Sequence, residues 1–432
     1  MRKIAIIGGG SAKFVRELVV DFFSYEELRE LEISLMDIDA ERVARSERMI
    51  NKIIRDRKLP SRVSATTDRR QALEGADYVI VTIMVGGLKH YQSDVAIPAK
   101  YGVLQTVSDT IGPGGVFRCV RTAPVLRGLA SDLREVAPCA WLLNYANPMA
   151  MNLWTLLDSG HERSVGLCHS IQNTYPQIAR WIGIPPDEVR YTAGGLNHVN
   201  FYLTLEHKGR NIYPDLLAAK DRVVTAEPWE RPRFELLEAI GYFPAEGPQH
   251  QTEYYPWFRK DETVAKQYAC ETYWGYDRDS ANYKARVSEV DRQITGKEPI
   301  VYERSNEYGA RILHSLETGR PRVFYGNIRN HGLIENLPPQ AVVETPCLAD
   351  ANGITPCRVG QLPAALAALM TPHVAVHGMA VEGALTKSRR LVRQAIQADP
   401  LTGAILTLPQ IRAMTDELFL ENAEYTSDWA TD

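Results

Sequence analysis

The sequence has few cysteines and no long run of charge of one sign. Its 432 residues contain six cysteines without the spacing of a disulfide framework, which indicates a reducing cytoplasm and thiols free to bind metal. Lys and Arg number 49 against 53 Asp and Glu, a net charge of −4, so nucleic acid and anionic membranes are poor candidates for partners. The first apolar run breaks at Gly8, so we expect neither a signal peptide nor a transmembrane segment.

The length and the pattern of the chain predict two domains of different architecture. Over roughly the first 200 residues, apolar strand-like runs alternate with helical stretches, which is typical of a doubly wound parallel α/β sheet. From Phe201 the alternation fades into shorter strands and helices. We therefore expect a Rossmann-like domain, as in lactate and malate dehydrogenases, over residues 1–197. A mixed α+β domain ending in helices should occupy residues 198–432.

A glycine-rich turn near the N-terminus predicts a dinucleotide site. An apolar strand over residues 4–7 runs into Gly8-Gly9-Gly10-Ser11, and a helix should follow over residues 14–23. This layout offers backbone N–H groups at a helix N-terminus to a pyrophosphate. The match is partial, because Lys13 stands where the third glycine of G-x-G-x-x-G would be. An ordinary tight turn is the alternative.

An acidic residue follows the second strand at the distance expected for the ribose-binding acid. The strand over residues 33–36 ends in Asp37, whose carboxylate can bind a ribose 2′-hydroxyl and would repel a 2′-phosphate. The sequence therefore predicts NAD rather than NADP. A further strand, over residues 78–83, carries Thr82, which we include among the cofactor contacts.

Three later apolar runs are each followed at once by polar side chains. We interpret each run as a buried strand of a parallel sheet, and such sheets bind ligands at the carboxyl ends of their strands. The polar residues expected to face one crevice are Asn147, Cys168, His169 and His198. A thiolate and an imidazole together can hold a divalent transition metal, although a spacing of 30 residues between Cys168 and His198 matches no zinc motif.

Three other segments are expected to surround this crevice or to support it. The stretch Asp109–Gly115 is too glycine-rich for a regular element, so we expect a flexible loop. Residues 227–260 are rich in proline and aromatic side chains, which suits a small-ligand site as well as a plain core. The tail over residues 362–420 has helical periodicity, with breaks expected at Pro372, Pro400 and Pro409.

The sequence resembles glycoside hydrolase family 4, the NAD-dependent glycosidases, over nearly its whole length. The motifs that carry the resemblance are Gly8-Gly9-Gly10-Ser11, Leu35-Met36-Asp37-Ile38-Asp39, residues 109–115, residues 144–152, Cys168-His169-Ser170, Asn197-His198, Glu253-Tyr254 and Asn336-Leu337-Pro338. Within the family, Cys168-His169-Ser170 resembles the α-galactosidase (melibiase) branch.

The resemblance implies an unusual route to hydrolysis of α-galactosides. The sugar is oxidised transiently at C3 in an NAD-dependent step, loses its C2 proton, eliminates the leaving group, takes up water and is reduced again. NAD and a divalent metal, usually Mn²⁺, are the implied cofactors, and the metal acts as a Lewis acid. The implied partners are a small glycoside substrate and further copies of the chain, as a homodimer or homotetramer.

The resemblance also assigns roles to the residues of the crevice. Cys168 and His198 match the metal ligands, and Tyr254 matches the base that removes the C2 proton. A tyrosine hydroxyl, with a pKa of about 10, needs a neighbouring cation for that task, and the metal would supply it. Asp109 matches an acidic position that tunes or orients the tyrosine, and Asn147 matches a substrate contact.

His169 and the choice of sugar stay open at this point. In phospho-sugar relatives the position of His169 is an aspartate that protonates the leaving group, so His169 is either that acid or a substrate contact. α-Glucosidases, α-glucuronidases and α-galacturonidases of the same family are alternatives; a uronidase should set a cation such as Arg304 or Lys89 against the substrate carboxylate. A plain NAD-dependent hydroxy-acid dehydrogenase or an NAD-sensing module would not need Cys168.

Overall fold

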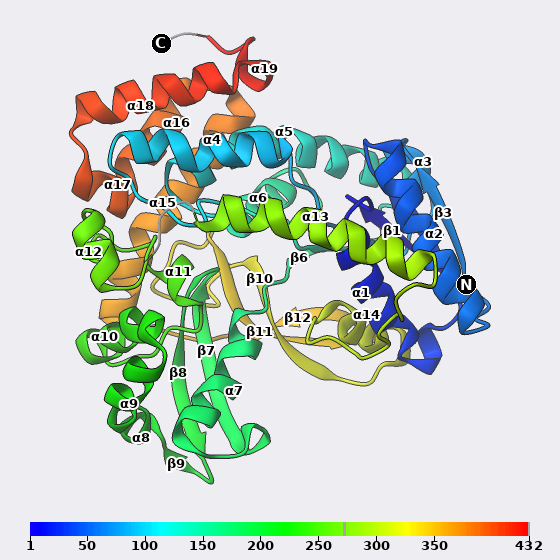
Figure 1. The fold of residues 1–432 in the computed structure, drawn as a ribbon, viewed down its shortest axis with the longest axis horizontal. Coiled ribbons are helices and arrows are strands. Elements are labelled where there is room, and N and C mark those ends of the chain that lie inside the picture. The colour runs from blue at the N-terminus through cyan, green and yellow to red at the C-terminus, as the bar shows by residue number, and fades with distance from the viewer. Residues whose placement is uncertain (271–273, 431–432) are drawn as a thin grey trace.

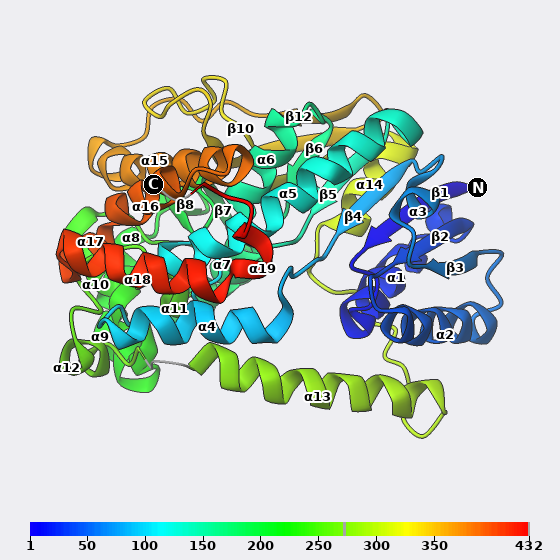
Figure 2. The same ribbon diagram turned by 90° about the horizontal axis from the view of Figure 1, so that it is seen from above.

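The N-terminal half is built on a parallel sheet, as the alternation of elements predicts. The computed structural model describes residues 1–270 and 274–430. Six parallel strands lie in the order β3-β2-β1-β4-β5-β6 (Figure 1 and Figure 2, with each strand labelled in Figure 2). They are β1 (Arg2–Ile7), β2 (Leu31–Met36), β3 (Arg62–Thr66), β4 (Tyr78–Val81), β5 (Trp141–Asn144) and β6 (Ser164–Gly166). The order reverses between β1 and β4, which is where doubly wound sheets bind their ligands.

Helices cover both faces of this sheet, so alternate residues of one strand enter different cores. Ile4 and Ile6 of β1 join one apolar cluster with α1, while Ala5 and Ile7 join another with α5. Burial on both faces explains why these strands read as continuous apolar runs. The helices of this half are α1 (Ala12–Phe23), α2 (Ala40–Asp56), α3 (Arg69–Leu73), α4 (Gly87–Lys100), α5 (Gly112–Val136), α6 (Met149–Asp158) and α7 (Ser170–Ile182).

The glycine-rich stretch after Asp109 is not the flexible loop that its composition predicts. Helix α5 begins at Gly112, with a proline in its first turn, and all four residues from 112 to 115 are buried. A Cβ at Gly114 would lie 2.1 Å from the hydroxyl of Ser108, and a Cβ at Gly115 would lie 2.6 Å from backbone of Thr110. The glycines therefore let the helix approach the preceding segment closely, which overrides their low helix propensity.

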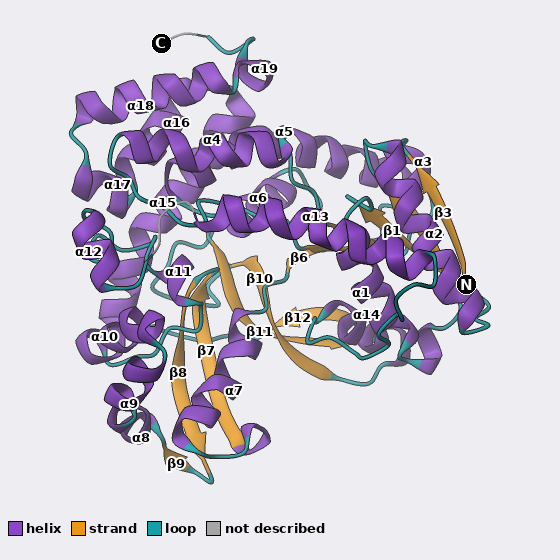
Figure 3. Ribbon diagram, viewed as in Figure 1, coloured by secondary structure: helices purple, strands orange, loops and turns teal. Residues whose placement is uncertain are grey.

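The same sheet continues with antiparallel strands from the second half of the chain. From β6 the order runs through β10 (Arg322–Arg329), β11 (Val342–Asp350), β7 (Val189–Leu196), β8 (Val199–His207) and β9 (Arg210–Asn211), with β12 (Gly353–Pro356) paired to β11. Figure 3 shows these strands as orange arrows in the lower middle of the view, with helices such as α7 and α9 beside β7 and β8. The prediction that the run over residues 194–196 belongs to a parallel strand is wrong, because it ends β7, whose described pairings are antiparallel.

The remaining helices lie around this mixed sheet. They are α8 (Tyr213–Ala218), α9 (Lys220–Ala226), α10 (Arg231–Ile240), α11 (Pro248–Gln251), α12 (Glu262–Gln267), α13 (Trp274–Ile294), α14 (Gly309–Thr318), α15 (Ala364–Thr386), α16 (Arg389–Ala398), α17 (Pro400–Ile405), α18 (Leu408–Glu421) and α19 (Ala423–Thr426). Figure 2 shows α13 extended along one side of the molecule, beside α4 and α2. The C-terminal helices α15 to α18 pack against α4, α5 and one another.

Helix α15 is long and apolar enough to cross a membrane by length and composition, and half of its apolar window is buried inside the protein. It passes through Pro372, so the predicted break there is wrong, whereas α17 begins at Pro400 and Pro409 lies in the first turn of α18. Met370 and Val374, on either side of Pro372, are buried in the main apolar cluster. This packing outweighs the hydrogen bond that the proline removes.

Candidate active site

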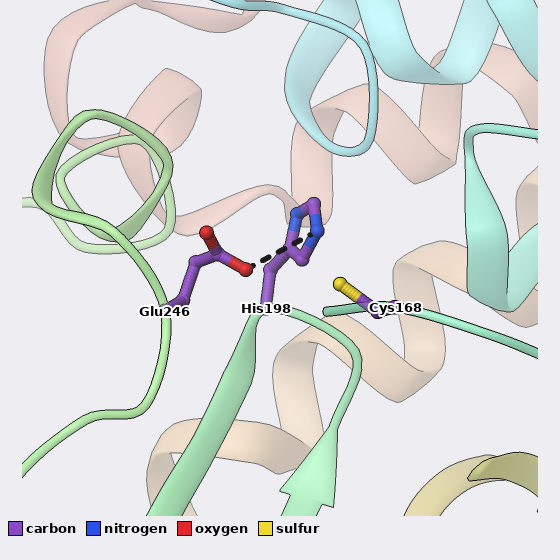
Figure 4. A group of neighbouring side chains, drawn as sticks. All are labelled: Cys168, His198 and Glu246. Carbon is purple, nitrogen blue, oxygen red and sulfur yellow. Dashed lines mark ion pairs between the residues drawn. The ribbon is translucent and has the colours of Figure 1, made fainter. Parts of the chain in front are cut away.

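Three side chains with metal-binding atoms meet where the parallel and antiparallel parts of the sheet join. Cys168 follows β6, His198 lies in the turn between β7 and β8, and Glu246 precedes α11. Their donor atoms all lie within 4.8 Å of one another, and His198 Nε2 is 3.3 Å from Glu246 Oε2. Figure 4 shows the three side chains pointing toward a common centre. The sequence prediction brings Cys168 and His198 together correctly, although His198 arrives from a hairpin.

The hairpin turn fixes the position of His198. Its φ is 63°, a left-handed conformation that non-glycine residues adopt uncommonly. Three positions before His198, in β7, Gly195 has φ 149°, and a Cβ there would lie 2.4 Å from the carbonyl oxygen of Val199. The glycine therefore permits the tight reversal that carries His198 to the end of β6.

The charges around the cluster suit a bound cation. Burial raises the pKa of the Cys168 thiol well above its usual value, and the carboxylates of Glu246 and Glu344 raise it further. Burial lowers the pKa of His198 to about 4, so its imidazole is neutral at pH 7. Burial alone would raise the pKa of Glu246, but His198 and His250 hold it well below its usual range. A divalent cation would deprotonate the thiol and use the neutral imidazole.

Among the described residues, two buried atoms of the cluster lack a hydrogen bond, which supports a bound cation, although one of them, Glu246 Oε2, lies 3.3 Å from His198 Nε2. Glu246 Oε2 and His198 Nδ1 have no hydrogen-bond partner in the described part of the chain. Buried polar atoms without partners are rare in folded proteins and call for a ligand or an ion. The sulfur, nitrogen and oxygen donors form a mixed set that fits a first-row transition dication. The residues present therefore fit a metal.

A second histidine, His250, was not assigned from the sequence. Its ring centroid lies 4.4 Å from that of His198, its Nδ1 is 3.3 Å from Glu246 Oε1, and its Nε2 is 3.5 Å from Asp109 Oδ1. Burial alone would lower the pKa of His250, but the two carboxylates raise it well above the usual value. The raised pKa favours the charged imidazole, which lies between Glu246 of the three-residue group and Asp109.

Glu246, His250 and Tyr254 stand four residues apart in sequence, and this spacing is the signal that could have revealed Glu246 and His250. Residues four apart would share one face of a helix, although in the structure α11 (Pro248–Gln251) includes only His250, with Glu246 before it and Tyr254 after it. The proline and aromatic residues of this stretch predict a ligand-site wall or a core, and that interpretation misses Glu246 and His250.

Asp109 and Asn147 lie together beside this histidine, as predicted. Asn147 Nδ2 donates to Asp109 Oδ2 at 2.8 Å, and Arg118 approaches the same carboxylate at 3.9 Å. Burial alone would raise the pKa of Asp109, but His250, Arg118 and His198 hold it well below its usual range. Asp109 is therefore ionised, and it orients the amide of Asn147.

Tyr254 is buried behind the cluster. Its side chain is 1% exposed, and its ring centroid lies 6.3 Å from that of His198. The neighbouring Glu253 accepts hydrogen bonds from the backbone N–H groups of Thr106, Val107 and Ser108 at 2.6 to 3.0 Å. One carboxylate therefore ties the backbone before Asp109 to the residue next to Tyr254.

His169 lies at the edge of the site rather than in it. It is the N-cap residue of α7, its side chain is 60% exposed, and its Nδ1 is 3.5 Å from Glu307 Oε1. The structure therefore places His169 next to Cys168 in the chain but outside the buried metal-ligand cluster.

The glycine turn has the shape of a dinucleotide cradle. Gly8 has φ 93°, and a Cβ there would lie 2.7 Å from Thr82, whose hydroxyl donates to Gly8 O at 3.0 Å. Gly10 N donates to Asp37 Oδ2 at 2.9 Å. The side chain of Ser11 makes no capping bond to α1, and Ala12 N donates to Gly10 O at 3.0 Å, so the start of the helix offers a phosphate the N–H groups that follow Ala12. These residues fit a pyrophosphate and a ribose hydroxyl.

Comparison with known proteins gives one consistent family. Residues 3–184 match the family 4 glycosyl hydrolase model, and residues 193–402 match the model of the family 4 glycosyl hydrolase C-terminal domain. An α-galactosidase of Rhizobium meliloti is 38% identical over 99% of this chain and 90% of its own, and one of Bacillus subtilis is 37% identical over 99% and 100%. A Thermotoga maritima 6-phospho-β-glucosidase structure with manganese, NAD⁺ and glucose-6-phosphate has a TM-score of 0.81 at 22% identity, covering 98% of this chain and 99% of its own.

Proposed function

The chain belongs to family 4 of the glycosyl hydrolases, and we propose that it hydrolyses α-galactosides with NAD and Mn²⁺ as cofactors. The observation that carries the proposal is the group formed by Cys168, His198 and Glu246 beside the buried Tyr254. Full-length similarity to two α-galactosidases supports the choice of sugar.

The proposed reaction makes a difficult bond cleavage easier by changing the sugar first. Bound NAD⁺ supplies a reversible hydride acceptor for C3, and a bound dication supplies a Lewis acid for the sugar oxygens. As a C3 ketone, the sugar has a C2 proton acidic enough for a protein base to remove. The glycosidic oxygen then leaves from C1, water adds there, and C3 is reduced again, so no net oxidation occurs.

The residues of the chain divide this work. Cys168, His198 and Glu246 hold the cation, and the Tyr254 hydroxyl oxygen takes the C2 proton. Asp109, kept ionised, orients the amide of Asn147 toward a sugar hydroxyl. The glycine turn and Asp37 hold the pyrophosphate and the adenosine ribose of NAD.

The structure does not favour a uronic acid substrate. The two cations considered for a substrate carboxylate are engaged elsewhere: Arg304 donates to Ser24 Oγ at 2.9 Å and lies over the ring of Tyr25, and Lys89 is an exposed partner of Glu424. A uronate held near Asp109 and Glu246 would face two carboxylates. These observations support a neutral sugar.

Dependence on NAD, metal and proton exchange tests the proposal. We expect a p-nitrophenyl α-galactoside to be hydrolysed only with NAD⁺, Mn²⁺ and a thiol reductant, and EDTA to abolish turnover. Product formed in D₂O should carry deuterium at C2, since the proton removed by the base exchanges with solvent. Activity unaffected by EDTA or by removal of NAD⁺, or product without deuterium, would contradict the mechanism.

The third metal donor has its own test. Glu246→Gln should weaken Mn²⁺ binding by about 10- to 100-fold while Cys168 and His198 still hold some metal, so excess Mn²⁺ should restore much of the activity. Calorimetric titration with Mn²⁺ measures the affinity. The matched control is Glu238→Gln. Glu238 lies on α10, is partly exposed and pairs with Lys220. Unchanged Mn²⁺ affinity in Glu246→Gln would remove Glu246 from the ligand set.

We also propose a cytoplasmic location and a homodimer or homotetramer. The six cysteines are all free in the structure, and Cys168 must stay reduced to bind metal, which supports a reducing compartment. Light scattering of the purified protein measures the oligomeric state.

A further inference from the structure

A cavity of about 330 Å³ adjoins the metal-ligand cluster. Glu246 lines it, as do His169 and Ser170, which directly follow Cys168. Its described lining does not include Asn147 or Tyr254. The cavity therefore meets the metal-ligand cluster at Glu246, without Cys168 or His198 in its described lining, and is separate from the residues proposed to contact the galactose ring. We call it the leaving-group cavity.

One wall of the leaving-group cavity is an unpartnered aromatic ring. Trp229 lies in a short 3-10 turn, η3 (Pro228–Glu230), just before α10, and its side chain is 44% exposed. In the described part of the chain, its ring packs on no other aromatic ring or guanidinium. Exposed tryptophans are common at binding sites because the ring offers a large apolar face with little loss of entropy. The C–H face of a pyranose would cover such a ring.

The guanidinium of the leaving-group cavity is already paired. Arg233 is 1% exposed, and all its N–H groups have partners. Its Nε and Nη2 contact the carboxylate of Glu230, and Nη2 also donates to Gln177. Its Nη1 donates to the Thr174 hydroxyl and to the backbone carbonyl of Glu246. No free guanidinium remains for a phosphate or a carboxylate. The same bonds fix the floor of the cavity to the backbone of Glu246.

The groups left for a ligand are neutral and polar. The side-chain oxygen of Gln177 accepts a hydrogen bond from Arg233, so the NH₂ group of Gln177 can donate to a ligand. The side chains of Asn173 and Gln249 also line the cavity. An apolar platform with a few amide groups is the pattern of small neutral ligand sites. Hydroxyl groups match such amides, since they both donate and accept.

We propose that the leaving-group cavity binds the aglycone and that this aglycone is a neutral sugar unit stacked on Trp229. The proposal rests on the proposed function, because the galactose ring must occupy the space beside Tyr254 and Asn147. The substituent on C1 then has the adjoining cavity open to it, with His169 at the junction. The preferred substrate is an α-galactosyl oligosaccharide without phosphate or carboxylate on its second sugar.

Two substrates that share galactose and differ in the aglycone test the proposal. The native protein should cleave an α-galactosyl-(1→6)-glucose disaccharide with kcat/KM at least about tenfold above that for methyl α-galactoside. Trp229→Ala should lower kcat/KM for the disaccharide by about tenfold, whereas kcat/KM for methyl α-galactoside should stay within about twofold of the native value. Trp229→Phe, which keeps a ring, should recover most of the loss. Tyr302→Ala, at an aromatic side chain of similar exposure outside the cavity, is the control and should change neither value.

The outcomes separate this proposal from the proposed function. If Trp229→Ala lowered kcat/KM equally for both substrates, or for neither, the proposed role of the leaving-group cavity would be wrong. The proposed α-galactosidase function would not be affected by that result. Cleavage of neither substrate by the native protein would overturn the proposed function. Calorimetric titration of the NAD- and Mn²⁺-loaded protein with the disaccharide then decides the cavity by itself: binding that Trp229→Ala weakens supports it, and binding that the substitution leaves unchanged overturns it.

Discussion

Replacing Cys168 with serine should lower α-galactoside hydrolysis by about 1,000-fold or more, because several kcal/mol of transition-state stabilisation would leave with the metal. A buried serine hydroxyl is far harder to deprotonate than a thiol, and the nearby carboxylates of Glu246 and Glu344 already raise the pKa of the sulfur. Serine would therefore offer a weak neutral oxygen in place of a thiolate. The measurements are kcat and the manganese content after dialysis.

NAD binding distinguishes loss of the metal from loss of the fold. The glycine turn and Asp37 lie at β1 and β2, whereas Cys168 follows β6, so Cys168→Ser should keep its NAD affinity within about twofold. Cys139→Ser, at an exposed free cysteine outside the cluster, should behave like the native protein in every assay. A Cys168→Ser protein with normal manganese content and full activity would show that the sulfur is not a ligand.

The nucleotide half could be predicted from local sequence because its rules are local. A strand, a glycine turn, a helix and an acid after the second strand follow one another within 37 residues, and the structure has them in that order. Periodicity also gave the helices of the C-terminal tail. It failed at Pro372 and at the glycines after Asp109, where burial against distant segments overrides propensity.

The site was only partly predictable because its members come from distant parts of the chain. Cys168 and His198 were predicted to share one crevice from the pattern of apolar runs, and family resemblance matched them to the metal ligands; the parallel strand expected before His198 was wrong, although the two side chains do meet. Glu246 lies in a loop whose position depends on Arg233, a tertiary contact that no local pattern reveals. Sequence spacing four residues apart could have suggested Glu246 and His250, but not the 3.3 Å between His198 and Glu246.

The second large effect concerns Tyr254, the proposed base. Tyr254→Phe should lower kcat by about 10²- to 10⁴-fold, the range for loss of a general base, and should lower deuterium incorporation at C2 in parallel. Manganese content and NAD affinity should not change, because the substitution removes one oxygen from a ring that stays buried. KM should change little, which would separate a role in proton transfer from one in substrate binding.

Tyr254 can act as a base only if a neighbouring cation lowers the pKa of its hydroxyl. Burial raises the pKa of the Tyr254 hydroxyl well above its usual value, the Thr110 hydroxyl lowers it, and the carboxylates of Asp109 and Glu246 raise it again. Without a dication, little of Tyr254 is therefore deprotonated at neutral pH. Removing the metal should thus remove both the Lewis acid and the phenolate that acts as the base.

The adjacent tyrosine gives the matched control for this argument. Tyr255 is equally buried, and its hydroxyl accepts a hydrogen bond from Gln251 Nε2 at 2.9 Å. Tyr255→Phe should cost about 1 kcal/mol of unfolding free energy and keep kcat within about threefold, since that hydroxyl bonds to the scaffold. If Tyr254→Phe and Tyr255→Phe lowered kcat equally, the effect would be structural. If Tyr254→Phe kept full C2 exchange, another group would have to remove the proton, and the ionised Asp109 would be the next candidate because it lies close to His250 and Asn147.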